Sequence, residues 1–144
     1  MLLNDRGEVS IQHARKWDYY KLTGGCVEIG ETEEDALRRE IIEEVGCAIT
    51  IEDELGIILE WRNQRNLLYL SYGYLCRVHG DIGKPQYEQD EIDDDFKPIW
   101  IPLEESIKLM KQHMRSQPYE ARFMVTIEKR FLEEARNLLK KALD

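Results

Sequence analysis

Residues 32–46 constrain the fold most strongly, because they carry both a start signal and a stop signal for a helix. Thr32 is an expected N-cap, and the acidic residues after it interact favourably with the positive end of a helix dipole. Gly46 is an expected C-terminal stop, since glycine readily takes the left-handed conformation that ends many helices. We therefore predict a helix over Glu33–Val45.

Three carboxylates gather on one side of this predicted helix. At about 100° per residue, Glu43 lies roughly 60° to one side of Glu40, and Glu44 lies roughly 40° to the other side. Apolar residues occupy a separate, adjoining arc, namely Leu37, Ile41, Ile42 and Val45. The pattern predicts a packing face and a distinct acidic face on the same helix.

The acidic face has two interpretations. Like charges one helical turn apart repel each other, so Glu40 and Glu44 gain nothing from their proximity alone. A divalent cation would reverse that interaction, and hard cations such as Mg²⁺ and Mn²⁺ prefer oxygen ligands. A solvated, glutamate-rich helix face is the alternative, and the three carboxylates taken by themselves favour it.

The remainder of the chain is organised as strands on both sides of this helix, followed by two further helices. Strands are predicted at residues 9–13, 17–22, 57–62, 67–78 and 99–101, the last of them short and buried. Residues 80–95 form a long acidic loop in this prediction. Helices are expected after Pro102 and over about residues 119–143. This order predicts an α+β fold with helices packed on a mixed sheet.

Composition limits the class of protein. A length of 144 residues with 42% hydrophobic content fits one domain, residues 1–144, with its own core. The net charge of -9 argues against a surface that coats nucleic acid or docks on an anionic membrane, since both need basic residues. The odd count of cysteines, with no zinc spacing, predicts a reducing cytoplasm. Neither a signal peptide nor a membrane-spanning apolar run is recognisable.

A longer pattern surrounds the three glutamates. It reads Gly, five residues, Glu, seven residues, Arg-Glu, two residues, Glu-Glu, one residue, Gly, and its members are Gly25, Glu31, Arg39, Glu40, Glu43, Glu44 and Gly46. Ile41 and Cys47 fill its two apolar positions, cysteine acting as a small hydrophobe. Ordinary residue usage gives a chance match of about 10⁻⁸ for each starting point. Residues 25–47 thus resemble the box of the Nudix hydrolases, and the solvated-face interpretation becomes the weaker one.

The resemblance implies a fold and an activity. The Nudix fold is an α/β/α sandwich, with a mixed sheet between helices. The family's reaction is hydrolysis of a pyrophosphate bond in a nucleoside diphosphate derivative, here a small-molecule substrate. By resemblance, Mg²⁺ or Mn²⁺ would be held by Glu40, Glu43 and Glu44, with Glu31 at longer reach. Metal ions in such a site neutralise phosphate oxygens and acidify the attacking water.

Other residues have expected roles with stated alternatives. Arg39 would orient the carboxylates, or form a surface salt bridge. Gly24 and Gly25 would bring peptide groups close to phosphate, or simply shape a turn. Either Glu44 or Glu91 would act as general base, although a solvated acidic loop also accounts for Glu91. A Nudix-like domain that binds a nucleotide without cleaving it is the alternative function.

Two departures from the family pattern affect these expectations. Thr23 stands where the family has proline, in the sequence Leu-Thr-Gly-Gly that precedes the box. Only residues 1–3 remain of the strand that the family has before the first turn. We expect either a short strand in the sheet or a translation start upstream of Met1. The long final helix leaves homodimerisation open.

Overall fold

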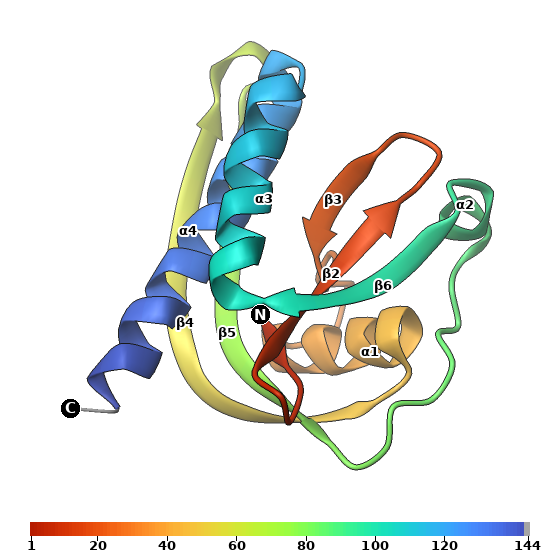
Figure 1. Ribbon diagram of the computed structural model, residues 1–144. Helices are drawn as coiled ribbons and strands as arrows, with labels where there is room; N and C mark the ends of the chain where they lie inside the picture. The colour runs from red at the N-terminus through yellow and green to blue at the C-terminus, as the bar shows by residue number, and fades with distance from the viewer. Residues whose placement is uncertain (143–144) are drawn as a thin grey trace.

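The computed structural model describes residues 1–142 and shows a six-stranded mixed sheet with helices on both sides (Figure 1). The strands are β1 (Leu2–Leu3), β2 (Glu8–Ala14), β3 (Tyr19–Leu22), β4 (Ala48–Arg62), β5 (Leu67–His79) and β6 (Phe96–Pro102). The helices are α1 (Glu33–Val45), α2 (Gln89–Asp93), α3 (Leu103–Ser116) and α4 (Tyr119–Lys141), with a 3-10 turn at Asn63–Arg65. The predicted α+β fold with a mixed sheet between helices is confirmed.

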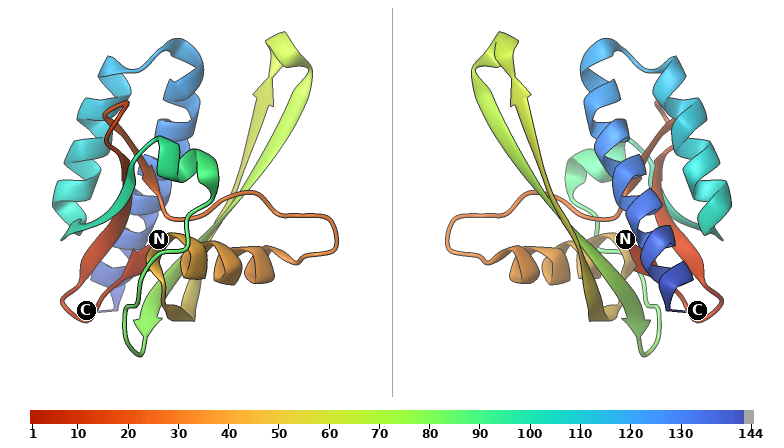
Figure 2. Two further views of the ribbon diagram at one scale, coloured as in Figure 1. Left: turned by 90° about the vertical axis from the view of Figure 1, so that its right-hand side faces the viewer. Right: turned by 90° about the vertical axis from the view of Figure 1, so that its left-hand side faces the viewer.

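The sheet is mixed because one strand pair is parallel. Strand β1 runs parallel to β5, whereas the other strand pairs among the described residues are antiparallel. The strand order is β3-β2-β1-β5-β4, and β6 pairs along the other edge of β2. Strands β4 and β5 form a long hairpin whose far end projects away from the body of the protein (Figure 2).

Helix α1 has the predicted boundaries, and its caps explain them. The Thr32 hydroxyl accepts a hydrogen bond from the Asp35 N–H, and the Asp35 carboxylate accepts one from the Thr32 N–H, which completes a capping box. Gly46 ends the helix with a φ of 79°, a left-handed conformation that favours glycine. The acidic segment is therefore a rigid helix and not part of a loop.

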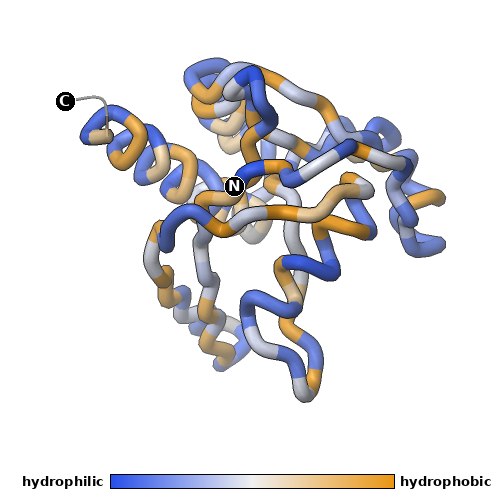
Figure 3. Tube along the Cα trace, turned by 90° about the horizontal axis from the view of Figure 1, so that it is seen from below, coloured by the Kyte–Doolittle hydropathy of each residue, from blue (hydrophilic) through white to orange (hydrophobic). Residues whose placement is uncertain are grey.

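Two cores lie on opposite faces of the sheet. Helices α3 and α4 cover one face, where the buried residues include Val9, Ile11, Met110, Val125 and Leu132. Helix α1 covers the other face, where Leu2, Ile41, Val45, Ile49 and Cys76 are buried. The helix that ends at the C-terminus alternates between apolar and polar residues, as a helix with one packed face does (Figure 3).

Several predicted boundaries were wrong for local reasons. Strand β4 begins at Ala48, well before the predicted residue 57, because two register shifts interrupt the alternation of apolar and polar residues there. Strand β3 begins at Tyr19, since Asp18 has a φ of 47° in the preceding turn. The predicted acidic loop contains α2, and Ile99–Ile101 is only half-buried. The predicted helix end at Leu143 lies outside the described residues.

The short first strand is part of the sheet. Leu2 and Leu3 are buried, and they pair with Cys76 and Arg77 of β5. The Met1 amino group donates a hydrogen bond to the Tyr74 carbonyl at 2.6 Å. The expected short strand is therefore present in the sheet. Within residues 1–142, no helix combines the length and the apolar character that crossing a bilayer requires.

Candidate active site

Glu44 is fully buried, whereas Glu40 and Glu43 are half-buried, so the predicted acidic face lies partly inside the protein. Its Oε1 atom lies 2.6 Å from Nζ of Lys21, and its Oε2 atom accepts a hydrogen bond from the Gly24 N–H at 2.8 Å. Ile42, which was assigned to the packing face, is 46% exposed instead. The helix is rotated so that one glutamate points into the protein, where a lysine from β3 meets it.

Burial and charge act in opposite directions on the Glu44 carboxyl. Burial raises its pKa to about 7, while the Lys21 ammonium and the Gly24 N–H work against that rise. The pKa of Lys21 is also perturbed: burial lowers it, and Glu44 more than offsets this, so that the net shift is upward. Lys21 therefore carries a positive charge into the acidic site of a strongly acidic protein.

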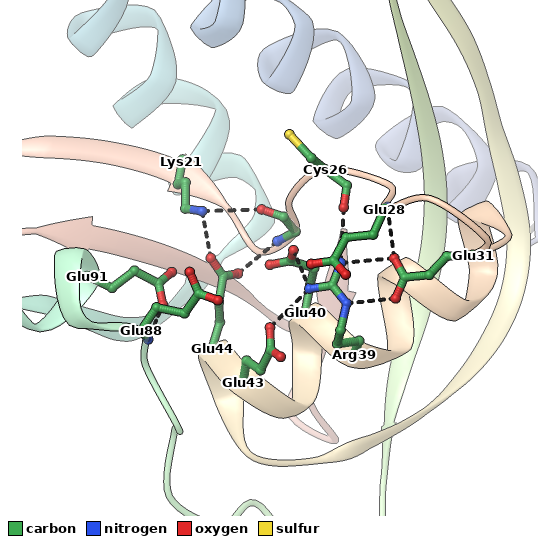
Figure 4. A network of polar contacts seen from close by, with 11 residues as sticks. Lys21, Cys26, Glu28, Glu31, Arg39, Glu40, Glu43, Glu44, Glu88 and Glu91 are labelled. Carbon is green, nitrogen blue, oxygen red and sulfur yellow. Dashed lines mark hydrogen bonds and ion pairs between the residues drawn. The ribbon is translucent and has the colours of Figure 1, made fainter.

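Arg39 connects three of the predicted site carboxylates (Figure 4). Its Nε and Nη2 atoms donate to the two carboxylate oxygens of Glu31, at 2.8 and 3.1 Å. Its Nη1 atom donates to Glu40 at 2.8 Å and to Glu43 at 3.1 Å. Nη2 also donates to the Cys26 carbonyl at 3.0 Å. The guanidinium therefore holds the loop before α1 against the helix, as expected of an orienting residue.

The paired glycines have separate structural roles. Gly24 has a φ of 137°, which a side chain would strain, and this conformation directs its N–H toward Glu44. Gly25 lies directly against the Glu40 carboxylate, and a Cβ atom there would overlap it. Gly25 thus leaves space for the Glu40 side chain. Gly24 thus shapes the turn and Gly25 allows close packing, and neither observation tests the expected approach of their peptide groups to phosphate.

Glu91 lies at the edge of this group, on helix α2. Its side chain accepts a hydrogen bond from the Glu88 N–H at 3.0 Å, which caps the start of that helix. Its negative charge contributes to the raised pKa values of Lys21 and Tyr87. Figure 4 shows Glu91 and Glu88 on the side of Glu44 away from Arg39. The fold thus brings α2, far along the chain, next to α1.

Lys21 was not predicted, although its position near the end of a strand before Gly-Gly could have indicated it. A link from Glu44 to the segment before α2 was not predicted either: Gln12 donates to the Glu44 carbonyl at 3.1 Å and accepts from the Tyr87 hydroxyl at 2.9 Å. No pattern in the sequence predicts this link, because Gln12 and Tyr87 are 75 residues apart.

A second buried carboxylate, Glu128 of α4, was also missed. Its Oε1 atom accepts a hydrogen bond from the Leu22 N–H at 3.2 Å, while its buried Oε2 atom has no hydrogen-bond partner among the described residues. Burial raises its pKa to about 8, although the Leu22 N–H and Lys21 oppose the rise. The available signal was a glutamate on the buried stripe of a helix, between Val125 and Leu132.

The donor set fits a hard divalent cation by its chemistry. Glu31, Glu40, Glu43 and Glu44 offer only carboxylate oxygens, the ligands that Mg²⁺ and Mn²⁺ prefer. Across residues 1–142, however, no three acidic, histidine or cysteine side chains are grouped closely enough to hold a metal ion. Ion pairs account for this: Arg39 binds Glu40 and Glu43, and Lys21 binds Glu44. These two cations offset part of the negative charge of the four carboxylates.

The known proteins that resemble this chain share its fold. A NUDIX domain model matches residues 1–123. A Nudix hydrolase from Nitrosomonas europaea has a TM-score of 0.66 at 16% identity, covering 94% of this chain and 85% of its own. The MutT protein from Methanosarcina mazei Go1 has a TM-score of 0.61 at 18% identity, covering 95% and 89%. An Ap4A hydrolase from C. elegans has a TM-score of 0.59 at 18% identity, covering 97% and 95%.

The family match and the structural likeness carry different weight. At 16–18% identity, the solved structures establish the fold alone. No curated protein matches this sequence significantly. The NUDIX domain match spans most of the chain and includes all seven box residues. The chain therefore belongs to the Nudix family of hydrolases, which split pyrophosphate bonds.

Proposed function

We propose that this protein hydrolyses a pyrophosphate bond in a nucleoside diphosphate derivative, with Mg²⁺ or Mn²⁺ held by Glu40, Glu43 and Glu44. The observation that best supports this proposal is that two cationic side chains bind the three carboxylates. Arg39 binds Glu40 and Glu43, and Lys21 binds Glu44. Two positive groups that orient three carboxylates from opposite sides suit a preorganised site. A solvated helix face would need neither the Arg39 contacts nor the Lys21 contact.

The metal, when bound, would neutralise phosphate oxygens and increase the acidity of a bound water. The protein's own groups would position the site. Arg39 keeps Glu31, Glu40 and Glu43 close to one another, and Gly25 leaves room for the Glu40 carboxylate. Glu31 would support the site through Arg39 or through water.

The general base remains a choice between Glu44 and Glu91. Glu44 has a pKa raised to about 7, which suits proton transfer near neutral pH, although its carboxylate already contacts Lys21 and Gly24. Glu91 lies on the short helix beside the site, and one of its oxygens caps that helix. Rate profiles against pH for Glu44→Gln and Glu91→Gln would separate them, because loss of the base removes the limb that rises with pH.

The proposal is tested by product analysis with a panel of nucleotide derivatives in the presence of Mg²⁺ or Mn²⁺. Release of a nucleoside monophosphate or of phosphate from at least one panel member is expected. Glu43→Gln and Glu44→Gln should each reduce turnover at least about 100-fold, the scale on which single catalytic groups act. Glu34→Gln is the matched control, since Glu34 is exposed on the same helix and pairs with Arg38, at 3.9 Å.

Two further outcomes distinguish the alternatives. Calorimetry should detect Mn²⁺ binding to the folded wild type and weaker binding to Glu43→Gln. Absence of metal uptake, even with nucleotide present, would refute the metal site. Stabilisation by a nucleotide without any product would instead support the non-cleaving nucleotide-binding domain.

A further inference from the structure

One face of the β4–β5 hairpin is apolar and uncovered. We call it the arm face, and it consists of Ile57, Leu59, Trp61, Leu68, Leu70 and Tyr72. These residues form three successive cross-strand pairs, and each of them is between 38% and 64% exposed. No charged residue interrupts the arm face. Such a surface is unusual in a protein with 34% charged residues.

The opposite face of the same hairpin is packed in its inner part, whereas Leu67 and Tyr69 nearer the tip are 44% and 37% exposed. Ile58 packs against the core under α4, and Glu60 is 8% exposed, with its carboxylate bound by Arg62 at 2.6 Å. The backbone of Gly73 lies against the ring of Phe131. Helix α4 therefore supports the hairpin from one side only.

The arm face continues a surface that α1 covers. On β5, Tyr72, Tyr74 and Cys76 are every second residue and therefore lie on the same side of the strand. Tyr74 and Cys76 pack in the core beneath α1. Beyond the first turn of α1, the same sheet face is bare. Figure 2 shows the hairpin extending past α1 into open space. The bare region is thus the outer half of a packing surface whose inner half is buried.

The size of the arm face suits association. Six large side chains exposed to this extent present on the order of 600 Å² of apolar surface, the upper end of what monomeric proteins show. A standard interface buries about 800 Å² on each partner, so the arm face with its rim is sufficient. Homodimer interfaces are more apolar than others and enriched in aromatic residues, which Trp61 and Tyr72 would supply.

The charges at the two ends of the hairpin favour a second copy of this chain as the partner. Arg65 is exposed at the tip, while Glu33, Glu34 and Glu54 lie near Tyr74 at the base, where burial and, after it, their charges raise the pKa of that tyrosine. A two-fold axis through the arm face would bring the tip of each hairpin to the base of the other. Opposite charges would then meet at both ends of an uncharged centre.

We propose that the arm face is a homodimer interface, in which two hairpins pack face to face and antiparallel about a two-fold axis. Each hairpin covers the apolar pairs of its partner, and Arg65 of one copy lies over the acidic base of the other. The proposal does not depend on the catalytic assignment. The C-terminal helix, earlier a candidate for homodimerisation, packs against α3 and the sheet and has no part in it.

Sedimentation velocity tests the proposal with the full chain. The wild type should sediment as a dimer of the 17.1 kDa chain at micromolar concentration. Leu59→Lys, which places a charge on the central pair of the arm face, should raise the dimer dissociation constant at least about 100-fold. Ile82→Lys is the control, because Ile82 is a comparably exposed apolar residue in the segment after β5. This variant should remain dimeric.

Further variants guard against misfolding. Leu59→Thr with Leu70→Thr keeps residues that favour strands and should also give a monomer with an unchanged circular dichroism spectrum. Arg65→Glu should weaken the dimer about tenfold, and adding Glu54→Arg should recover part of the loss. A wild type that is monomeric at about 100 μM would overturn the proposal, and so would a folded, dimeric Leu59→Lys variant. A monomeric wild type that binds to phosphatidylcholine vesicles would also overturn the proposal.

Discussion

The ammonium nitrogen of Lys21 lies 2.6 Å from a carboxylate oxygen of Glu44, and both side chains are largely withdrawn from solvent. Lys21 lies next to the last residue of β3, and Glu44 belongs to the last turn of α1. The pair therefore joins the sheet to α1 by charge. Removing one partner of such a pair leaves the other as an uncompensated buried charge.

Lys21→Met should destabilise the protein, and more so at pH 8 than at pH 6. With a pKa of about 7, Glu44 is mostly protonated at pH 6 and mostly charged at pH 8, so loss of the ammonium leaves an unpaired buried charge chiefly at pH 8. We expect a loss of about 3 kcal/mol in the free energy of unfolding at pH 8, the scale of a broken buried ion pair. Urea denaturation at the two pH values measures this. Lys97→Met, at an exposed lysine of β6, should change stability by less than about 1 kcal/mol.

Gly25→Ala should reduce activity while leaving the fold intact. The added methyl group would overlap the Glu40 carboxylate, which is the mobile end of a side chain and can move aside. Glu40 would then leave its position beside Arg39. We expect kcat/KM to fall at least about tenfold, as displacement of a site group by about an ångström does, with the melting temperature nearly unchanged. Cys26→Ala should retain activity, because only the Cys26 backbone carbonyl contacts Arg39.

Arg39→Lys should impair activity although it preserves the charge. A lysine cannot reproduce the planar fork that binds Glu31 through two atoms while reaching Glu40 and Glu43. We expect turnover to fall about tenfold or more, whereas stability should change by about 1 kcal/mol or less, since the pairs are partly exposed. Arg38→Lys on the same helix is the control. Equal activity of both variants would assign Arg39 to a surface salt bridge.

Stability should fall as pH rises toward 8, and Glu128 should cause part of the fall. Its pKa is about 8 in the folded protein against 4.5 as the reference value, so the folded state binds more protons between these limits. The stabilising effect of the protonated form is therefore complete below pH 4.5 and is lost as pH rises through 8. The change should be on the order of 3 kcal/mol between pH 5 and pH 8.

Glu128→Gln should flatten that profile, because the amide does not titrate and its oxygen can still accept the Leu22 N–H. Urea denaturation from pH 5 to pH 8 without divalent metal measures the slope. Glu105→Gln, at an exposed glutamate of α3, should keep the wild-type slope. A Glu128→Gln profile as steep as that of the wild type would exclude Glu128 as its source.

The sequence by itself determined α1 and the residues that one helix places together. Thr32 and Gly46 act within one or two turns, so the boundaries followed from local hydrogen bonding. Arg39 and Glu43 stand one turn apart, and their contact follows from helical spacing alone. The prediction of strands failed at β4, where two bulges change the alternation on which it depended.

The tertiary structure alone decided which carboxylate is buried and which cation meets it. A helical wheel gives the angle between Glu40 and Glu44, but the packing of Ile41 and Val45 against the sheet sets how the helix is rotated. Lys21 reaches Glu44 because β3 ends beside α1, and Leu22 meets Glu128 across 106 residues of chain. These contacts join segments that are far apart in the sequence and become neighbours only when the whole sheet has formed. No local sequence pattern can therefore predict them.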